Sequence, residues 1–169
     1  MIKSEKIRIG YYILLIKLRR KKTIKAGSLE EFAFEPGRYA YIGSAMNGLQ
    51  QRVARHLRKE KALRWHIDYL LAHAEIVDTA LFDITEEGAE EFLRNNIISI
   101  IEDALKIQKQ EQCAGSINKR KDSKILKTGK PLECLIAEAV VQTPGASVPV
   151  PRFGASDCRC AGHLVRLPD

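Results

Sequence analysis

The sequence of 169 residues has no run of about 18 consecutive apolar residues, the length that a membrane-spanning helix requires. It has no internal repeat either, and its apolar share of 45% and charged share of 29% are ordinary for a globular protein. A chain of this length can bury one full hydrophobic core. We therefore expect a single domain over residues 1–169 and no membrane partner.

Cysteine is scarce, with four in the chain. One residue separates Cys158 from Cys160, too few for an easy pairing, and the other two are scattered. Free thiols or a metal site are therefore favoured over disulfides. The short apolar run from Tyr12 to Leu18 lacks the small-residue cleavage site of a signal peptide. These features together predict a cytoplasmic protein.

The net charge of +7 is unevenly distributed. Residues 1–65 carry 16 basic and 5 acidic side chains, whereas residues 66–105 carry 1 basic and 10 acidic. Residues 106–130 are basic again, with 8 against 2. Such separation indicates a polarised surface whose basic side could attract a polyanion and release its counterions. Simple solvation of the charged side chains is the alternative.

Two strands are expected to form the centre of the core. Residues 7–18 are rich in β-branched, aromatic and leucine side chains without alternation, which is typical of a strand buried on both faces. A Pro36-Gly37 turn then precedes a strand over residues 38–43, in which Tyr39 and Tyr41 share a face. Residues 23–26 and 75–84 also read as strands.

The first helix is expected to begin after a cap at Asn47 and to end near Lys59. Its apolar spacing predicts that Leu49, Val53 and Leu57 face the core. Arg52 and His56 are four residues apart and should emerge together at the edge of that face. The side chains expected on the solvent side are Arg55, Arg58, Lys59 and Lys61.

Further along, residues 65–74 suggest a short helix, Thr85 is placed to cap a long helix over residues 86–108, and Pro131 to start one over residues 132–142. Residues 113–130 are polar and lysine-rich, as in a loop, and residues 144–151 should be extended. The predicted class is α/β, with a small central antiparallel or mixed three-stranded sheet flanked by helices.

Several short motifs occur in a characteristic order. They are Gly10-Tyr11-Tyr12, Tyr41-Ile42-Gly43, Gly48 with Arg52 and His56, Trp65 to Tyr69, Glu133-Cys134, and Phe153 to Leu164. This order resembles the GIY-YIG nuclease superfamily, and the later motifs resemble its Uri-type branch, which also occurs fused to endonuclease III-type repair glycosylases. The resemblance excludes roughly residues 86–130, which look like an insertion.

The resemblance implies a phosphodiester-cleaving site. Tyr12 and Tyr41 would orient or deprotonate the attacking water, Arg52 would offer a planar fork to the phosphate, and His56 would assist proton transfer or hydrogen-bond a tyrosine. Without that order, strand tyrosines filling a sheet face and a solvated Arg/His pair would be the simpler interpretation. The residues expected to contact nucleic acid are Gly43, Arg55, Arg58 and Lys59.

The resemblance also implies a divalent cation, Mg²⁺ or Mn²⁺, held by one glutamate on a later helix. Glu133 is our choice for this ligand, ahead of Glu138 and Glu102. A carboxylate in the first turn of a helix is also stabilised by the helix dipole, so a capping role for Glu133 is the alternative.

A zinc site is a separate hypothesis for the C-terminal segment. Asp157, Cys158, Cys160 and His163 supply ligand types for zinc, with Cys134 or His66 as further candidates. A single residue between two cysteines is unusual for zinc modules, so the alternative is that Asp157 caps a turn and the cysteines are small buried apolar groups.

Three functions remain open on these grounds. The first is a metal-dependent endonuclease that acts on DNA through backbone contacts with little sequence readout. The family's fusion partners suggest a role in DNA repair and a repair protein as a partner. The second is a non-catalytic nucleic-acid-binding module that uses the same basic face. A protein-interaction subunit using the acidic residues 86–105 is a third.

Overall fold

The computed structural model describes residues 7–105 and 130–168. Every helix in this part of the chain is too short or too polar to cross a lipid bilayer. The elements in chain order are β1 (Gly10–Leu18), β2 (Lys22–Lys25), β3 (Glu31–Phe34), β4 (Gly37–Ala45), α1 (Leu49–Leu57), α2 (His66–Leu71), β5 (Glu75–Asp83), α3 (Ala89–Asn95), α4 (Ile97–Ala104), α6 (Leu132–Val141) and β6 (Leu164–Leu167).

A four-stranded antiparallel sheet in the order β5-β1-β4-β6 forms the centre of the fold, and β2 and β3 pair as a separate hairpin. In the register of β1 with β4, Tyr12 lies opposite Gly43 and Leu14 opposite Tyr41. The pairing of β4 with β6 ends at Tyr41 and Leu164. Both central strands are buried on both faces, as residues 7–18 predicted.

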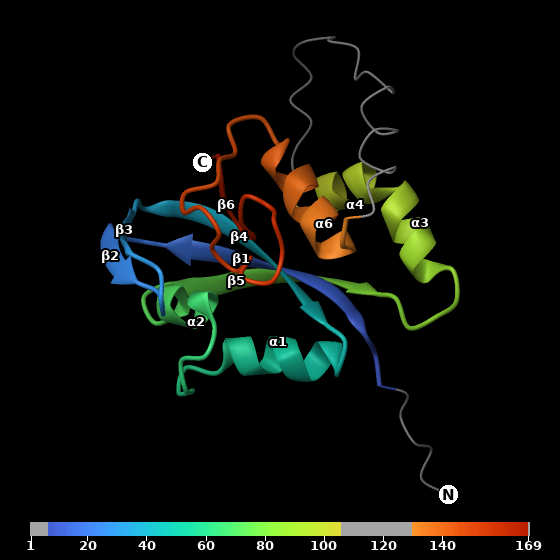
Figure 1. Cartoon of the computed structure of the whole chain (residues 1–169), viewed down its shortest axis with the longest axis horizontal. Coiled ribbons are helices and arrows are strands. Elements are labelled where there is room, and N and C mark those ends of the chain that lie inside the picture. Colours follow the sequence, from blue (N-terminus) through green and yellow to red (C-terminus); the bar gives the residue numbers. More distant parts are fainter. Residues whose placement is uncertain (1–6, 106–129, 169) are drawn as a thin grey trace, which may run out of the picture.

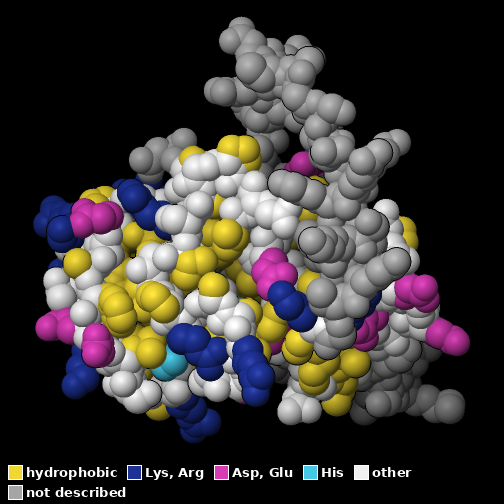
Figure 2. All heavy atoms as spheres, turned by 45° about the horizontal axis from the view of Figure 1, so that its top comes forward, with side chains coloured by type: hydrophobic (Ala, Val, Ile, Leu, Met, Phe, Trp, Pro, Cys, Tyr) yellow, Lys and Arg dark blue, Asp and Glu magenta, His cyan; other side chains and the backbone are white. Residues whose placement is uncertain are grey.

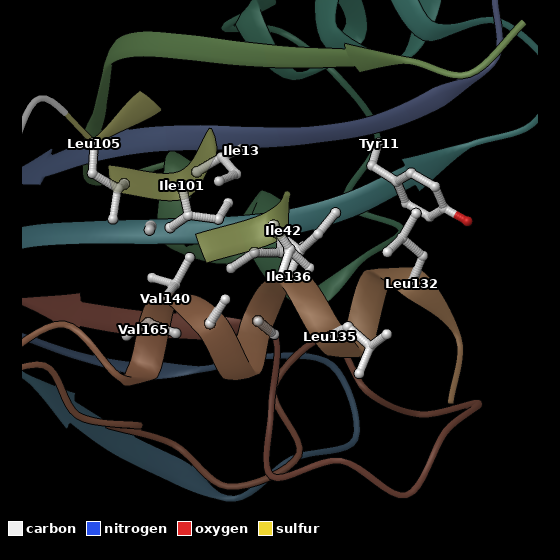
Figure 3. Close-up of a cluster of buried hydrophobic side chains, with 14 of the residues drawn as sticks. Tyr11, Ile13, Ile42, Ile101, Leu105, Leu132, Leu135, Ile136, Val140 and Val165 are labelled. Carbon is white, nitrogen blue, oxygen red and sulfur yellow. The ribbon is translucent and has the colours of Figure 1, made fainter. Parts of the chain in front are cut away.

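Helices cover the sheet on both sides, with α3, α4 and α6 on one face and α1 and α2 on the other (Figure 1). Alternating side chains of β1 divide between the two resulting cores, because neighbouring strand residues point to opposite faces. Tyr11, Ile13 and Leu15 pack against α4 and α6, as Figure 3 shows for the first two. Tyr12, Leu14 and Ile16 belong to the core beneath α1 and α2. The sequence motif around Gly10 therefore contributes one tyrosine to each face.

The predicted α/β class, the antiparallel central sheet and its flanking helices are confirmed. Tyr39 and Tyr41 do share a face, within the same core as Tyr12. Two short strands were not anticipated: β6 is the fourth strand of the central sheet, and β3 pairs with β2 in the separate hairpin. Four residues give too short a stretch for periodicity to be recognised, and these strands are defined by their partners.

The predicted solvent and core faces of α1 need correction. Its N-cap is Gly48 rather than Asn47, and Leu57 is 56% exposed while His56 is 3% exposed. At 100° per residue, position 56 lies about 20° from Leu49 around the helix, whereas position 57 lies about 80° away. His56 is therefore nearer to the centre of the buried stripe, and its burial makes it part of the core rather than of the surface.

The expected helix over residues 86–108 is two helices within its described part. α3 starts at Ala89, after Gly88 with φ 80°, and Asn96 interrupts the path between α3 and α4. The Asn96 side chain donates to the Phe92 carbonyl, which competes with the helical hydrogen-bond pattern. Thr85 does not cap, because its hydroxyl accepts a hydrogen bond from the Ile9 amide. Residues 106–129, with most of the predicted loop, lie outside the described residues.

Candidate active site

Tyr12 on β1 and His56 on α1 form the centre of the site. The Tyr12 hydroxyl lies 2.8 Å from His56 Nε2, and both side chains are buried. Burial lowers the pKa of His56 to about 4, with Lys61, Arg55 and Arg52 acting in the same direction and Asp68 opposing it. The imidazole is therefore neutral near pH 7; in the tautomer with its proton on Nδ1, toward Asp68, Nε2 accepts the hydrogen bond that the tyrosine donates.

Tyr41 on β4 packs against the same histidine. Its ring centroid is 6.3 Å from that of His56 and 6.4 Å from that of Phe153, both in edge-on geometry. Burial raises the pKa of Tyr41 well above its ordinary value, and the neighbouring Tyr12 adds to this effect. Burial likewise raises the pKa of Tyr12. Both tyrosines are thus neutral phenols at neutral pH.

Two glycines make room for the tyrosine rings. A Cβ atom at Gly43 would lie 2.3 Å from the Tyr12 hydroxyl oxygen, and one at Gly154 would lie 2.8 Å from the Tyr41 ring. Gly154 has φ 72°, and its amide donates to His66 Nδ1 at 3.1 Å. Only glycine at position 43 leaves room for the Tyr12 ring. The same lack of a side chain would also let the backbone approach a ligand.

Arg52 occupies the outer part of the site, one turn before His56 on α1. Its guanidinium carbon is 4.4 Å from the centre of the Trp65 ring, a cation–π contact. Its charge lowers the pKa of Tyr12 and Tyr41, against the larger effect of burial, which places it within electrostatic range of both hydroxyls. The structure therefore brings together Tyr12, Tyr41, Arg52 and His56.

Asp68 is a buried carboxylate whose importance was not recognised from the sequence. It is 0% exposed, accepts two hydrogen bonds from Arg55 at 3.0 and 2.9 Å, and accepts the backbone amides of Arg64 and Trp65. Its Oδ1 also lies 3.9 Å from His56 Nδ1. The available signal was an acidic residue three positions after Trp65 at a helix start, the pattern of an N-terminal cap.

The expectation that Arg55 and Lys61 take the solvent side is wrong. The Arg55 guanidinium is paired with Asp68 and stacks on Trp65 at 4.0 Å, and Lys61 Nζ is 3.8 Å from Asp68 and donates to the His56 carbonyl. A buried carboxylate attracts both cations. Of the basic residues expected to contact nucleic acid, Arg58 and Lys59 are exposed.

Glu133 lies in the first turn of α6, as predicted, and its side chain is 21% exposed. Its Oε1 is 3.2 Å from His163 Nδ1, so the carboxylate is directed toward the C-terminal segment. It contributes to the raised pKa of Tyr11, Tyr12 and Tyr41, each of which is raised mainly by burial. The negative charge of Glu133 therefore acts electrostatically on the tyrosine hydroxyls, although α6 covers the opposite face of the sheet from α1.

A second group of side chains gathers beside Glu133. Among the residues that the structure describes, Cys134, Cys158, Cys160 and His163 form a cluster that could hold a metal ion such as zinc, with their ligand atoms all within 4.8 Å of one another. Cys134 completes this set. Asp157 is exposed and His66 accepts the Gly154 amide, so neither of these two candidates belongs to the cluster.

A family model described as "Domain of unknown function DUF123" matches residues 11–109 and 113–169. The chain belongs to the DUF123 family. No curated protein and no solved structure gave a significant match.

Charged side chains of both signs lie on the surface of this DUF123 chain (Figure 2). On this face Lys and Arg side chains (dark blue) gather at the lower centre, and Asp and Glu side chains (magenta) lie at the right-hand margin and also beside Lys and Arg at the left. The helix α3, whose first turn carries Glu90 and Glu91, lies across the sheet from α1 (Figure 1). The basic α1 region and the acidic α3 region are thus separate.

Proposed function

We propose that this DUF123 chain is a metal-dependent endonuclease of the GIY-YIG type that hydrolyses DNA phosphodiester bonds. The observation that carries the proposal is the Tyr12–His56 hydrogen bond of 2.8 Å, with Tyr41 and Arg52 around the same imidazole. Residues from positions 12, 41, 52 and 56 converge from two strands and a helix. Core packing alone requires neither an arginine at the rim nor a histidine within the buried stripe.

In this proposal the tyrosines act as neutral hydrogen-bonding groups. Because the Tyr12 proton is held by His56 Nε2, the lone pairs of its oxygen are free to accept a hydrogen bond from the attacking water. His56, whose Nδ1 lies 3.9 Å from Asp68 Oδ1, is the group to which the Tyr12 proton would shift when the water gives up its own. Arg52 would neutralise charge on the phosphoryl oxygens through its planar fork.

The donor set suits a hard cation such as Mg²⁺ or Mn²⁺ only in part. Glu133 offers one half-buried carboxylate, with one oxygen directed at His163. Mg²⁺ keeps several waters and commonly binds through one or two carboxylates together with substrate phosphates, so one glutamate is sufficient. We propose that Glu133 holds this ion, which would stabilise the leaving oxygen when bound.

The proposed substrate is DNA, gripped through its backbone. Arg58 and Lys59 are exposed at the end of α1, beyond Arg52, and residues 1–65 hold most of the positive charge. Phosphate contacts fix position and carry no sequence information, so we propose little sequence readout. A role in DNA repair, with a repair protein as partner, follows only from the fusion partners of the Uri-type branch.

The proposal is tested by nicking assays on supercoiled, single-stranded and branched DNA with Mg²⁺ or Mn²⁺. The native chain is compared with Tyr41→Phe, Arg52→Ala and Glu133→Ala, with Glu138→Ala as a control on the same helix. We expect metal-dependent nicking that falls by a factor on the order of 10² or more in the three site variants and is retained in the control.

Nicking that survives all three substitutions would refute the assignment of the site. The runner-up function, a non-catalytic nucleic-acid-binding module, predicts a different outcome. In that case the native chain would bind DNA with a strong dependence on salt concentration and would not nick it with either metal.

A further inference from the structure

We infer that Cys134, Cys158, Cys160 and His163 bind one Zn²⁺ ion, and that this ion positions Glu133 of the proposed active site. The contacts among these side chains converge on His163. Its Nε2 lies 2.9 Å from Cys160 Sγ, 3.6 Å from Cys158 Sγ and 3.7 Å from Cys134 Sγ. The Sγ atoms of Cys158 and Cys160 are 2.8 Å apart.

Two of these distances, from His163 Nε2 to the sulfur atoms of Cys158 and Cys134, already match a tetrahedral zinc site, and the other two are shorter, so Cys160 would move outward to admit the ion. With zinc–sulfur bonds of about 2.3 Å and zinc–nitrogen bonds of about 2.0 Å, neighbouring ligand atoms of a tetrahedron are roughly 3.5–3.8 Å apart. Three thiols and one imidazole are a common set for structural zinc, and it is closed, with no position left for substrate. The set therefore favours zinc over Mg²⁺, which prefers oxygen ligands.

The environment of the imidazole supports a metal ligand rather than a core histidine. His163 is 1% exposed, presents Nε2 to all three sulfur atoms and presents Nδ1 to Glu133 Oε1 at 3.2 Å. A histidine bound to zinc through one nitrogen and held at the other by a carboxylate is a recurrent arrangement, in which the carboxylate fixes the ring. Glu133 would be that carboxylate.

The cluster also connects separate parts of the fold. Cys134 belongs to α6, and the other three ligands belong to the segment between Phe153 and β6. The His163 carbonyl accepts the amide of Ile42 at 2.9 Å, next to Tyr41, and its own amide donates to the Phe153 carbonyl at 2.8 Å. Zinc would therefore join α6 and the C-terminal segment to β4 at Tyr41. Its positioning of Glu133 for Mg²⁺ rests on the proposed function, whereas zinc binding itself does not.

The experiment measures zinc in the untagged full-length chain by elemental analysis and replaces it with Co²⁺. We expect about one zinc per chain, the absorption bands of tetrahedral thiolate-bound Co²⁺, and a melting temperature that falls by about 10 °C when a chelator removes the ion. A chain without zinc whose three cluster thiols react freely would overturn the inference, and so would a Cys158–Cys160 disulfide in the intact mass.

Two sets of variants distinguish metal ligands from residues that only pack. Cys160→Ser should lower zinc affinity by a factor of about 10² or more, Cys160→His should restore it, and Cys113→Ser should leave it unchanged. Glu133→Gln should lower zinc affinity by about 10–100-fold, while Glu138→Gln on the same helix should not. Circular dichroism checks that each variant is folded. Equal zinc affinity in Glu133→Gln and the native chain would overturn the positioning of Glu133.

These readouts do not involve DNA. A zinc-loaded chain that fails to nick DNA would defeat the proposed function and leave the zinc site intact. A native chain that contains no zinc and still nicks DNA would support the proposed function and overturn the zinc site.

Discussion

The hydroxyl of Tyr12 and Nε2 of His56 are 2.8 Å apart, although 44 residues separate them in the chain. Because the pKa of Tyr12 is raised and that of His56 is lowered to about 4, the proton resides on the tyrosine. This pair gives the proposed site its geometry, and it is buried beneath the edge where Arg52 stacks on Trp65.

Replacing His56 with alanine should slow DNA nicking by a factor on the order of 10²–10³, because Tyr12 loses the acceptor that orients its hydroxyl. Tyr12→Phe should have a similar effect, and the double variant should lose little more than either single one, since the two act as a unit. Single-turnover nicking rates measure this. Fully additive losses would mean that the two residues act separately.

The buried His56 also predicts a dependence of stability on pH. Its pKa in the folded chain, about 4, lies below the ordinary value of 6.5, so the unfolded state binds a proton first as the pH falls. The native chain should therefore lose on the order of 2–3 kcal/mol between about pH 6.5 and pH 4 from this group. Denaturant titrations of the native chain and of His56→Gln across this pH range measure the loss in the free energy of unfolding. The loss should be smaller in the variant.

Asp68→Asn should destabilise the fold by about 2–4 kcal/mol, because the variant leaves the Arg55 guanidinium and Lys61 without a buried counter-charge. Glu60→Gln, an exposed site nearby in the chain, should change stability by less than about 0.5 kcal/mol. Urea unfolding provides the comparison. A small loss in Asp68→Asn would show that the carboxylate does not hold α1 and α2 together.

Gly43→Ala should displace the Tyr12 ring, since the added methyl group would lie 2.3 Å from its hydroxyl oxygen. We expect a loss of stability of about 1–3 kcal/mol and a fall in nicking rate of at least about tenfold. Ser44→Ala is the matched control, because the side chain at position 44 points to the other face of the sheet. Crystallography or aromatic NMR shifts of the variant would report the ring position directly.

The sequence predicted the central strands and the residues of the site better than it predicted their burial. β1, β4 and α6 were recognised because their apolar content and turn signals are strong over nine or ten residues. The exposure of Leu57 and burial of His56 were missed, since an apolar residue at nearly helical spacing is assigned to the core ahead of a polar one. The role of Asp68 was missed because its partners come from α1 and the preceding loop, and such pairing has no local pattern.

The C-terminal cluster illustrates the same limit. Asp157, Cys158, Cys160 and His163 were predicted as ligand candidates, with Cys134 or His66 as further ones, but identifying Cys134 as the fourth member of the cluster required the packing of α6 against the segment before β6. Sequence separation of 24 residues between Cys134 and Cys158 carries no information about that contact. The tertiary contact identifies Cys134 as the fourth residue of the cluster.

The most direct test of the central claim compares two arginines of the α1 region, Arg52 and Arg58. Each substitution by alanine removes one positive charge, but only Arg52 lies within electrostatic range of Tyr12 and Tyr41. Single-turnover nicking of saturating DNA with Mg²⁺ should fall on the order of 10²-fold in Arg52→Ala and stay within about threefold of native in Arg58→Ala. Equal rates in the two variants would contradict the assignment of this site as the place where DNA is cleaved.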